Sequence, residues 1–170
     1  MKSNHLRLSV LLLPFIGSIL FYSCKPQNDK VGVKQSFAII DSVDHMTDNI
    51  SRDLAAKGPI AWLDYLDHMP QLFMVSDGQI NFNDYQSAEK FIRDTVSKSI
   101  IKVTLKWKGK NIAWLTRDVA TINSGVHEDL LLAGGQSVAY DGYFSGTAVS
   151  TPSGWKLVNL NWSTQKPVSK

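Results

Sequence analysis

The stretch Ile101-Lys102-Val103-Thr104-Leu105-Lys106-Trp107-Lys108 decides the fold of this chain. Apolar residues alternate in it with three lysines and a threonine, and this period of two is typical of a strand with one buried face. Further apolar runs predict strands at 112–123, 126–132, 138–150 and 155–163. The turns expected around them are Gly109-Lys110-Asn111, Gly134-Gly135 and Pro152-Ser153-Gly154. The second half of the chain is therefore predicted to form an antiparallel sheet.

Upstream of this stretch the apolar residues recur every three or four positions, which is the period of a helix. The pattern predicts a long amphipathic helix at 33–54, a short helix at 60–66 and a third helix capped by Asn83 or Asp84. A hairpin at Asp77-Gly78 precedes the third helix. Helices followed by antiparallel strands predict an α+β fold, in which three N-terminal helices pack on a curved sheet and leave a cone between the layers.

The composition is that of a globular domain, with 44% hydrophobic and 19% charged residues among 170. The single cysteine excludes an intramolecular disulfide framework. Lys2 and Arg7 lie in an N-terminal leader, so the rest of the chain has nearly balanced charge and no long basic run, and nucleic acid is not an expected partner. Asp41, His45 and Asp48 have helical spacing but fall on the polar side of the first helix, so neither a metal site nor a cofactor is expected.

Residues 1–23 are predicted to be a secretory signal peptide, because Lys2 and Arg7 precede an apolar run that is shorter than the roughly 20 residues of a membrane-spanning helix. The segment Leu20-Phe21-Tyr22-Ser23-Cys24 resembles the cleavage box of bacterial lipoproteins. This resemblance implies that Cys24 is lipidated and anchors the protein in the bacterial cell envelope. The expected location is the outer membrane, with the domain facing the periplasm. The alternative is a free cysteine after an ordinary signal peptide. Residues 24–32 are predicted to form a tether.

The terminal stretch Gly154-Trp155-Lys156-Leu157-Val158-Asn159-Leu160-Asn161-Trp162-Ser163, together with the order of the predicted elements, resembles the SnoaL-like branch of the nuclear-transport-factor-2-like superfamily. The resemblance covers most of the predicted domain at 33–164 and leaves 165–170 as a C-terminal tail. It implies a cystatin-like cone. The family includes isomerases, polyketide cyclases and dehydratases as well as members that only bind a ligand or another chain, so the fold does not choose the function.

The resemblance raises the question of which residues of this chain could act as acid–base groups. Where many relatives have histidines in the last strand, this chain has Asn159 and Asn161, which form hydrogen bonds but transfer no proton near neutral pH. Asp44 lies at the edge of the apolar arc of the first helix, and burial there would raise its pKa. His127 lies on a strand where relatives line or rim the cavity, and Tyr143 is a third candidate. The alternatives are a boundary residue for Asp44, a surface residue of a strand for His127 and a core-packing role for Tyr143.

Aromatic residues are expected to line the cone and to bind a flat or apolar ligand, with two asparagines as polar contacts. The predicted ligand-binding residues are Trp62, Trp107, Trp114, Tyr140, Tyr143, Asn159 and Asn161. We therefore expect a membrane-anchored, non-catalytic domain that binds a small apolar or aromatic ligand or a partner protein of the envelope. The alternatives are a SnoaL-like isomerase, cyclase or dehydratase that uses Asp44 or His127, and a structural subunit of an envelope complex. Lysines on the outer side of the 101–107 strand predict a monomer or a weak homodimer.

Overall fold

The computed structural model describes residues 32–165, so the predicted leader and Cys24 lie outside the described residues. The helical elements are α1 (Val33–Lys57), the 3₁₀ helix η1 (Pro59–Tyr65), α2 (Tyr85–Phe91), the π-helical turn η2 (Ile92–Val96) and α3 (Ser97–Ser99). The strands are β1 (Phe73–Ser76), β2 (Gln79–Phe82), β3 (Ile100–Thr116), β4 (Val119–Leu132), β5 (Ser137–Thr151) and β6 (Gly154–Thr164). In this part of the chain no helix is both long and apolar enough to span a bilayer.

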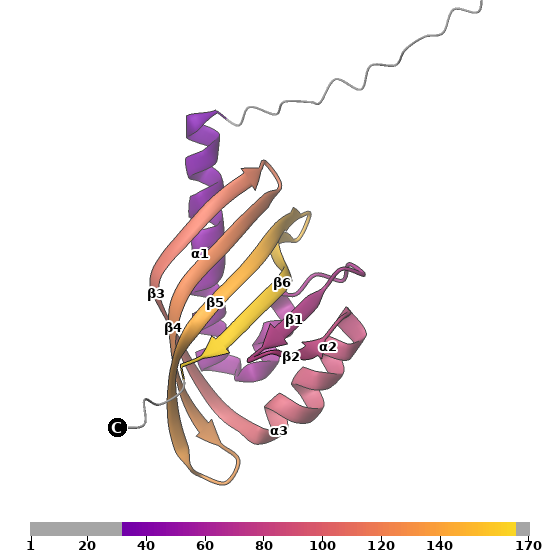
Figure 1. Cartoon of the computed structure of the whole chain (residues 1–170), viewed down its shortest axis with the longest axis vertical. Coiled ribbons are helices and arrows are strands. Elements are labelled where there is room, and N and C mark those ends of the chain that lie inside the picture. Colours follow the sequence, from indigo (N-terminus) through magenta and orange to yellow (C-terminus); the bar gives the residue numbers. More distant parts are fainter. Residues whose placement is uncertain (1–31, 166–170) are drawn as a thin grey trace, which may run out of the picture.

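The six strands form one curved sheet in the order β2-β1-β6-β5-β4-β3, and the helices pack on one of its faces (Figure 1). This arrangement confirms the predicted α+β fold. The sheet is mixed rather than purely antiparallel, because β1 runs parallel to β6, with Met74 opposite Leu160. A hairpin forces neighbouring strands to be antiparallel, but β1 and β6 are joined through most of the chain, so their connection imposes no direction.

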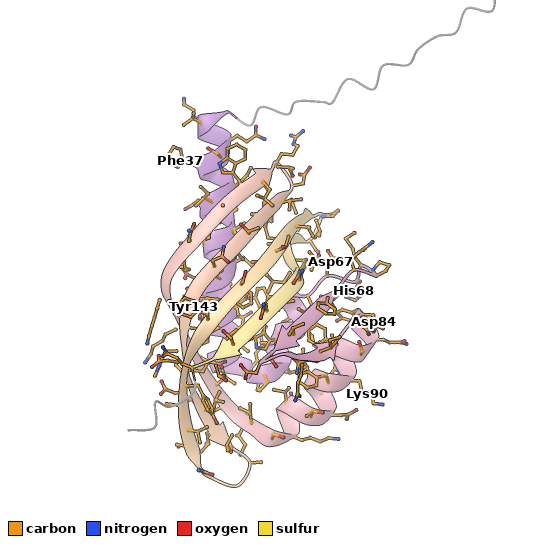
Figure 2. The ribbon with its side chains drawn as sticks, in the orientation of Figure 1. Phe37, Asp67, His68, Asp84, Lys90 and Tyr143 are labelled. Carbon is orange, nitrogen blue, oxygen red and sulfur yellow. The ribbon has the colours of Figure 1, made fainter. Side chains whose placement is uncertain are left out.

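The helical layer begins as the sequence pattern predicts. Val43, Ile50 and Leu54 of α1 are fully buried in the core. At the start of α2, Ser87 donates its backbone N–H to a carboxylate oxygen of Asp84 at 2.6 Å, which confirms Asp84 as the cap (Figure 2). Between β1 and β2, Asp77 and Gly78 both have positive φ, at 48° and 81°, which is the conformation that the primed hairpin turns require.

The segment at Gly109 is a bulge rather than the predicted turn. Strand β3 continues through it to Thr116, with a shift in its register to β4 between Lys108 and Asn111 and a positive φ of 67° at Gly109. A glycine with positive φ occurs in bulges as well as in turns, so Gly109-Lys110-Asn111 did not show which of the two structures forms. The bend directs Lys110 at α1, where its ammonium group lies 2.6 Å from Asp44 and 2.7 Å from Asp48.

A second bulge changes which residues of β6 face the core. Thr147 of β5 pairs with Asn159 but Ala148 pairs with Leu157, so Val158 is the extra residue. Leu157 and Leu160 are buried as a result, and Asn159 and Asn161 are exposed on the outer face of the sheet. The expectation that the two asparagines line the cone is therefore wrong, and Leu157 lies on the opposite face from them because strict alternation does not hold across a bulge.

Gly142 is the position of β5 at which the backbone has the least room. A Cβ atom built there would lie 2.3 Å from the carbonyl oxygen of Ser163 on β6, a distance that only backbone movement could relieve. We expect Gly142→Ala to lower the free energy of unfolding by about 2 kcal/mol or more. Urea unfolding followed by circular dichroism measures this loss.

The matched control is Gly134→Ala, because nothing lies within 4 Å of a Cβ atom at Gly134. We expect this control to change the free energy of unfolding by less than about 0.5 kcal/mol. Equal stabilities of the two variants would show that β5 and β6 approach each other less closely at Gly142 than described.

Candidate functional site

A cavity of about 280 Å³ lies between the helical layer and the sheet. Its walls come from η1, β1, β2, α2, η2 and β3 to β6, and most of its lining side chains are apolar or aromatic. Polar side chains also line it, and these are Ser76, Asp77, Asn81, Glu128, Tyr140 and Thr164. The cone that the sequence predicts is therefore hollow rather than filled.

Aromatic rings hold one another in place along the wall. The rings of Trp62 and Trp162 meet edge to face with their centroids 6.2 Å apart, and Phe144 meets Trp162 in the same way at 5.6 Å. Phe82 and Phe91 form a tilted pair at 6.2 Å. Such pairs fix ring orientation in addition to burying apolar area, so the wall is preformed.

Glu128 is the titratable group that the fold directs into this cavity from the middle strands of the sheet. The residues of β4 at even positions from Ala120 to Val126 face the core, and Glu128 continues that alternation. It pairs with Leu105 on β3 and with Tyr140 on β5. Burial raises the pKa of the Glu128 carboxyl to about 7. At neutral pH the group is therefore divided between its protonated and its ionised form.

No described residue forms a hydrogen bond or an ion pair with the Glu128 carboxyl, which fits burial as the cause of its raised pKa. An ionised carboxylate in apolar surroundings is costly unless a partner compensates for the lost water. The cavity thus contains a polar group that a bound molecule can satisfy.

The other polar side chains lie at the same end of the sheet as Glu128. Thr164 donates its backbone N–H and its hydroxyl to the two carboxylate oxygens of Asp77, at 2.7 Å and 2.6 Å. Thr164 pairs with Gly142, two residues from Tyr140, and Tyr140 is opposite Glu128. One end of the cavity is therefore polar and acidic, and the remainder is apolar.

Comparison with known proteins establishes the fold. No family model and no curated protein matches the chain, but solved structures do. A nuclear transport factor 2-like superfamily protein from Salmonella enterica is 18% identical, with a TM-score of 0.60 over 80% of this chain and 94% of that one. The chain has the nuclear-transport-factor-2-like fold.

Two further structures show how varied this fold is. A scytalone dehydratase-like protein from Novosphingobium aromaticivorans is 11% identical, with a TM-score of 0.68 over 79% of this chain and 89% of that one. A hexachlorocyclohexane dehydrochlorinase from Novosphingobium barchaimii is 11% identical, with a TM-score of 0.61 over 76% and 88%. At such identities the nuclear-transport-factor-2-like fold is common to all three proteins, and it does not transfer a reaction from one to another.

None of the three predicted acid–base residues lines the cavity of this nuclear-transport-factor-2-like domain. Asp44 forms an ion pair with Lys110 on the flank of α1. His127 lies on the outer face of the sheet and contacts Asp141 at 2.9 Å and Asp129 at 3.3 Å. The reason is parity, because Glu128 and not His127 has the inward register on β4.

Tyr143 lies on the outer face for the same reason and is 67% exposed (Figure 2). Of the predicted ligand-binding aromatics, Trp62 and Tyr140 line the cavity. Trp107 instead donates its indole N–H to the carbonyl oxygen of Thr47 on α1 at 2.9 Å, and Trp114 lies near the far end of β3, outside the cavity. Asn159 and Asn161 are also outside it, because they alternate along β6 with the inward residues Leu160 and Trp162.

Sequence reasoning missed Glu128, although a signal was present. In the run Val126-His127-Glu128-Asp129-Leu130 the apolar residues at both ends have the same parity as Glu128. A charged residue between two inward apolar positions of a strand is a candidate for a functional group. Across residues 32–165 there is no group of three or more histidine, cysteine or acidic side chains that is placed to hold a metal ion.

Proposed function

We propose that this protein binds one compact, largely apolar small molecule in the cavity, with Glu128 as its main polar contact. We further propose that the domain does so at the bacterial cell envelope, where a lipid on Cys24 anchors it. The fold supports the first part, since cavities between helices and a curved sheet suit ligands that need an apolar enclosure and a few fixed polar groups. The sequence around Cys24 supports the second part.

The observation on which the binding proposal depends is the Glu128 carboxyl, which has no partner among the described residues and lines an apolar cavity. A side chain needed only for folding would be more stable here if it were apolar, because burial of a carboxyl group has a cost. Polar groups with perturbed pKa values in clefts are typical of functional sites.

The size of the cavity limits the ligand. Its volume of about 280 Å³ exceeds the roughly 150 Å³ of an apolar cavity that takes up one benzene molecule. A single ring with a short polar substituent fits this volume. A hexachlorocyclohexane dehydrochlorinase has the same fold, and its named compound is a small substituted ring.

Titration calorimetry with 2-phenylethanol, a neutral molecule of this size, tests the binding proposal. We expect one saturable site per chain, and we expect Val96→Trp to abolish it, since Val96 of η2 lines the cavity. The matched control is Thr95→Trp, because the neighbouring Thr95 is exposed and outside the cavity, and it should bind as the wild type does. Absence of saturable binding, or equal binding by both variants, would contradict the proposal.

A second candidate function is acid–base catalysis at Glu128, in place of the Asp44 or His127 considered above. It is favoured by the pKa of about 7, which suits a group that both accepts and donates a proton near neutral pH. The experiment is exchange of the acidic C–H protons of 2-indanone in heavy water, followed by proton NMR. Exchange that the wild type accelerates and Glu128→Gln does not would replace the binding proposal by an enzymatic one.

The anchor has its own prediction. We expect the full-length wild type, made in a bacterium that processes lipoproteins, to sediment with membranes and to need detergent for release. Because stable anchoring depends on the acyl chains, Cys24→Ala should move the protein to the soluble fraction. Mass spectrometry of the mature N-terminus provides the control, and an unmodified Cys24 in the wild type would refute the prediction.

We also propose that the domain is a monomer or at most a weak homodimer. Two lysines on the outer face of β3 form ion pairs within the chain, since Lys106 lies 3.5 Å from Asp129 and Lys108 lies 2.5 Å from Asp141, and Lys102 on the same face is exposed. Burial of these charged groups in an interface would cost their hydration, which disfavours a tight dimer through this strand. Light scattering that found a tight dimer at nanomolar concentration would overturn the proposal.

A further inference from the structure

We propose that the ligand of the cavity is a small organic cation, an aromatic or aliphatic amine whose ammonium group pairs with Glu128. This inference rests on the proposed function and adds the chemical class of the bound molecule.

The charge of the cavity is the first argument. Glu128 supplies a carboxylate with no partner among the described residues, and no lysine, arginine or histidine is among the residues that line the cavity. Between largely apolar walls the field of such a carboxylate is only weakly screened, so it favours a cation and disfavours an anion.

The basic residues of the neighbouring strand β3 point away from the cavity. Lys106 and Lys108 of β3 form ion pairs on the outer face of the sheet. Lys110 is directed to α1, where it contacts Asp44 and Asp48. Lys102 is exposed on the outer face of the sheet, as Lys106 and Lys108 are, so none of these β3 lysines lines the cavity and a ligand can supply the positive charge there.

The walls supply the third argument. The aromatic side chains that line the cavity are Trp62, Phe82, Phe91, Tyr140 and Trp162. The faces of such rings attract ammonium groups, most strongly when water is excluded. A cavity that combines aromatic side chains with a carboxylate can recognise both the charge and the apolar body of an amine.

The proposal has a consequence for pH. An ammonium ion binds the ionised form of Glu128, so binding should strengthen as the pH rises through the pKa of about 7. The other titratable side chains that line the cavity are Tyr140 and Asp77. At about pH 5 only about one molecule in a hundred has Glu128 ionised, so the affinity for an amine should be at least about 10-fold lower than at about pH 8.

The test compares 2-phenylethylamine with 2-phenylethanol, which has the same skeleton and no charge, by titration calorimetry of the wild type. The amine stays protonated at both pH values, as lysine does. At about pH 8 we expect it to bind at least about 10-fold more tightly than the alcohol, and at about pH 5 we expect this preference to disappear. Phenylacetate, an anion of similar size, should not bind at pH 8.

Glu128→Gln should lower the affinity for the amine by about 10-fold or more and leave that for the alcohol within about threefold. The control is Glu89→Gln, since Glu89 is exposed on α2 and pairs with Arg93. If the alcohol binds and the amine has no advantage, the ligand is not a cation and the proposed function stands. If neither binds, both proposals fail. The comparison of pH 5 with pH 8 on the wild type also tests whether the ligand is a cation, and it does not depend on the folding of the variant.

Discussion

Glu128→Gln is expected to gain about 3 kcal/mol of unfolding free energy relative to the wild type when the pH is raised from about 4.5 to about 8. In the folded chain burial raises the pKa of Glu128 from its ordinary value of 4.5 to about 7. Between these two values the folded state holds a proton that the unfolded state has lost. The stability of the wild type must therefore fall over this range as the pH rises, and glutamine removes the titration.

Urea unfolding of both proteins at a series of pH values measures this difference. The comparison between pH values removes the cost of burying the glutamine amide, which is the same at each pH. Glu89→Gln is the control, because Glu89 is exposed and its substitution should change stability by less than about 1 kcal/mol. Parallel curves for the wild type and Glu128→Gln would mean that Glu128 is solvated.

Trp162→Ala is expected to lower the free energy of unfolding by about 3–5 kcal/mol. The Trp162 side chain is only 8% exposed, and its ring contacts both Trp62 on η1 and Phe144 on β5. Its removal enlarges a cavity that the neighbouring rings cannot refill without leaving their places. Thermal unfolding followed by circular dichroism measures the loss.

Trp114→Ala is the matched control, since the Trp114 side chain is 37% exposed and lies outside the cavity. We expect it to cost about 1 kcal/mol or less. If Trp114→Ala were the more damaging variant, the core would be centred near the far end of β3 instead of between η1 and the sheet.

The fold could be predicted from the sequence because it depends on long periodic patterns. The three-and-four spacing of α1 and the alternation of Ile101 to Trp107 each extend over enough residues to identify the element. The parallel pairing of β1 with β6 could not be predicted in the same way, because the partner of a short strand is decided by tertiary packing. Local turn signals such as Gly109 were ambiguous between a bulge and a reversal.

The site was harder to predict because it depends on parity, which a single bulge reverses. Asn159 and Asn161 were expected inside the cone from the resemblance to relatives with histidines on this strand, but they alternate with the buried Leu160 and Trp162 and face outward. The bulge at Val158 adds Leu157 to the buried side. On β4 the choice between His127 and Glu128 is a choice of one residue in register. Trp62 and Tyr140 were predicted correctly as cavity-lining residues. Their side chains are large and mostly apolar, so burial between the helices and the sheet is favoured.

The most direct test of the account is a carbon-13 NMR titration of the Glu128 side-chain carboxyl. Glu89 is the only other glutamate in the chain, so Glu89→Gln leaves a single glutamate signal to follow. We predict a midpoint near pH 7 in the free protein and a shift to lower pH when 2-phenylethylamine saturates the cavity. A midpoint near the ordinary 4.5 that the amine does not move would contradict the placement of this carboxyl in the cavity and its role in binding.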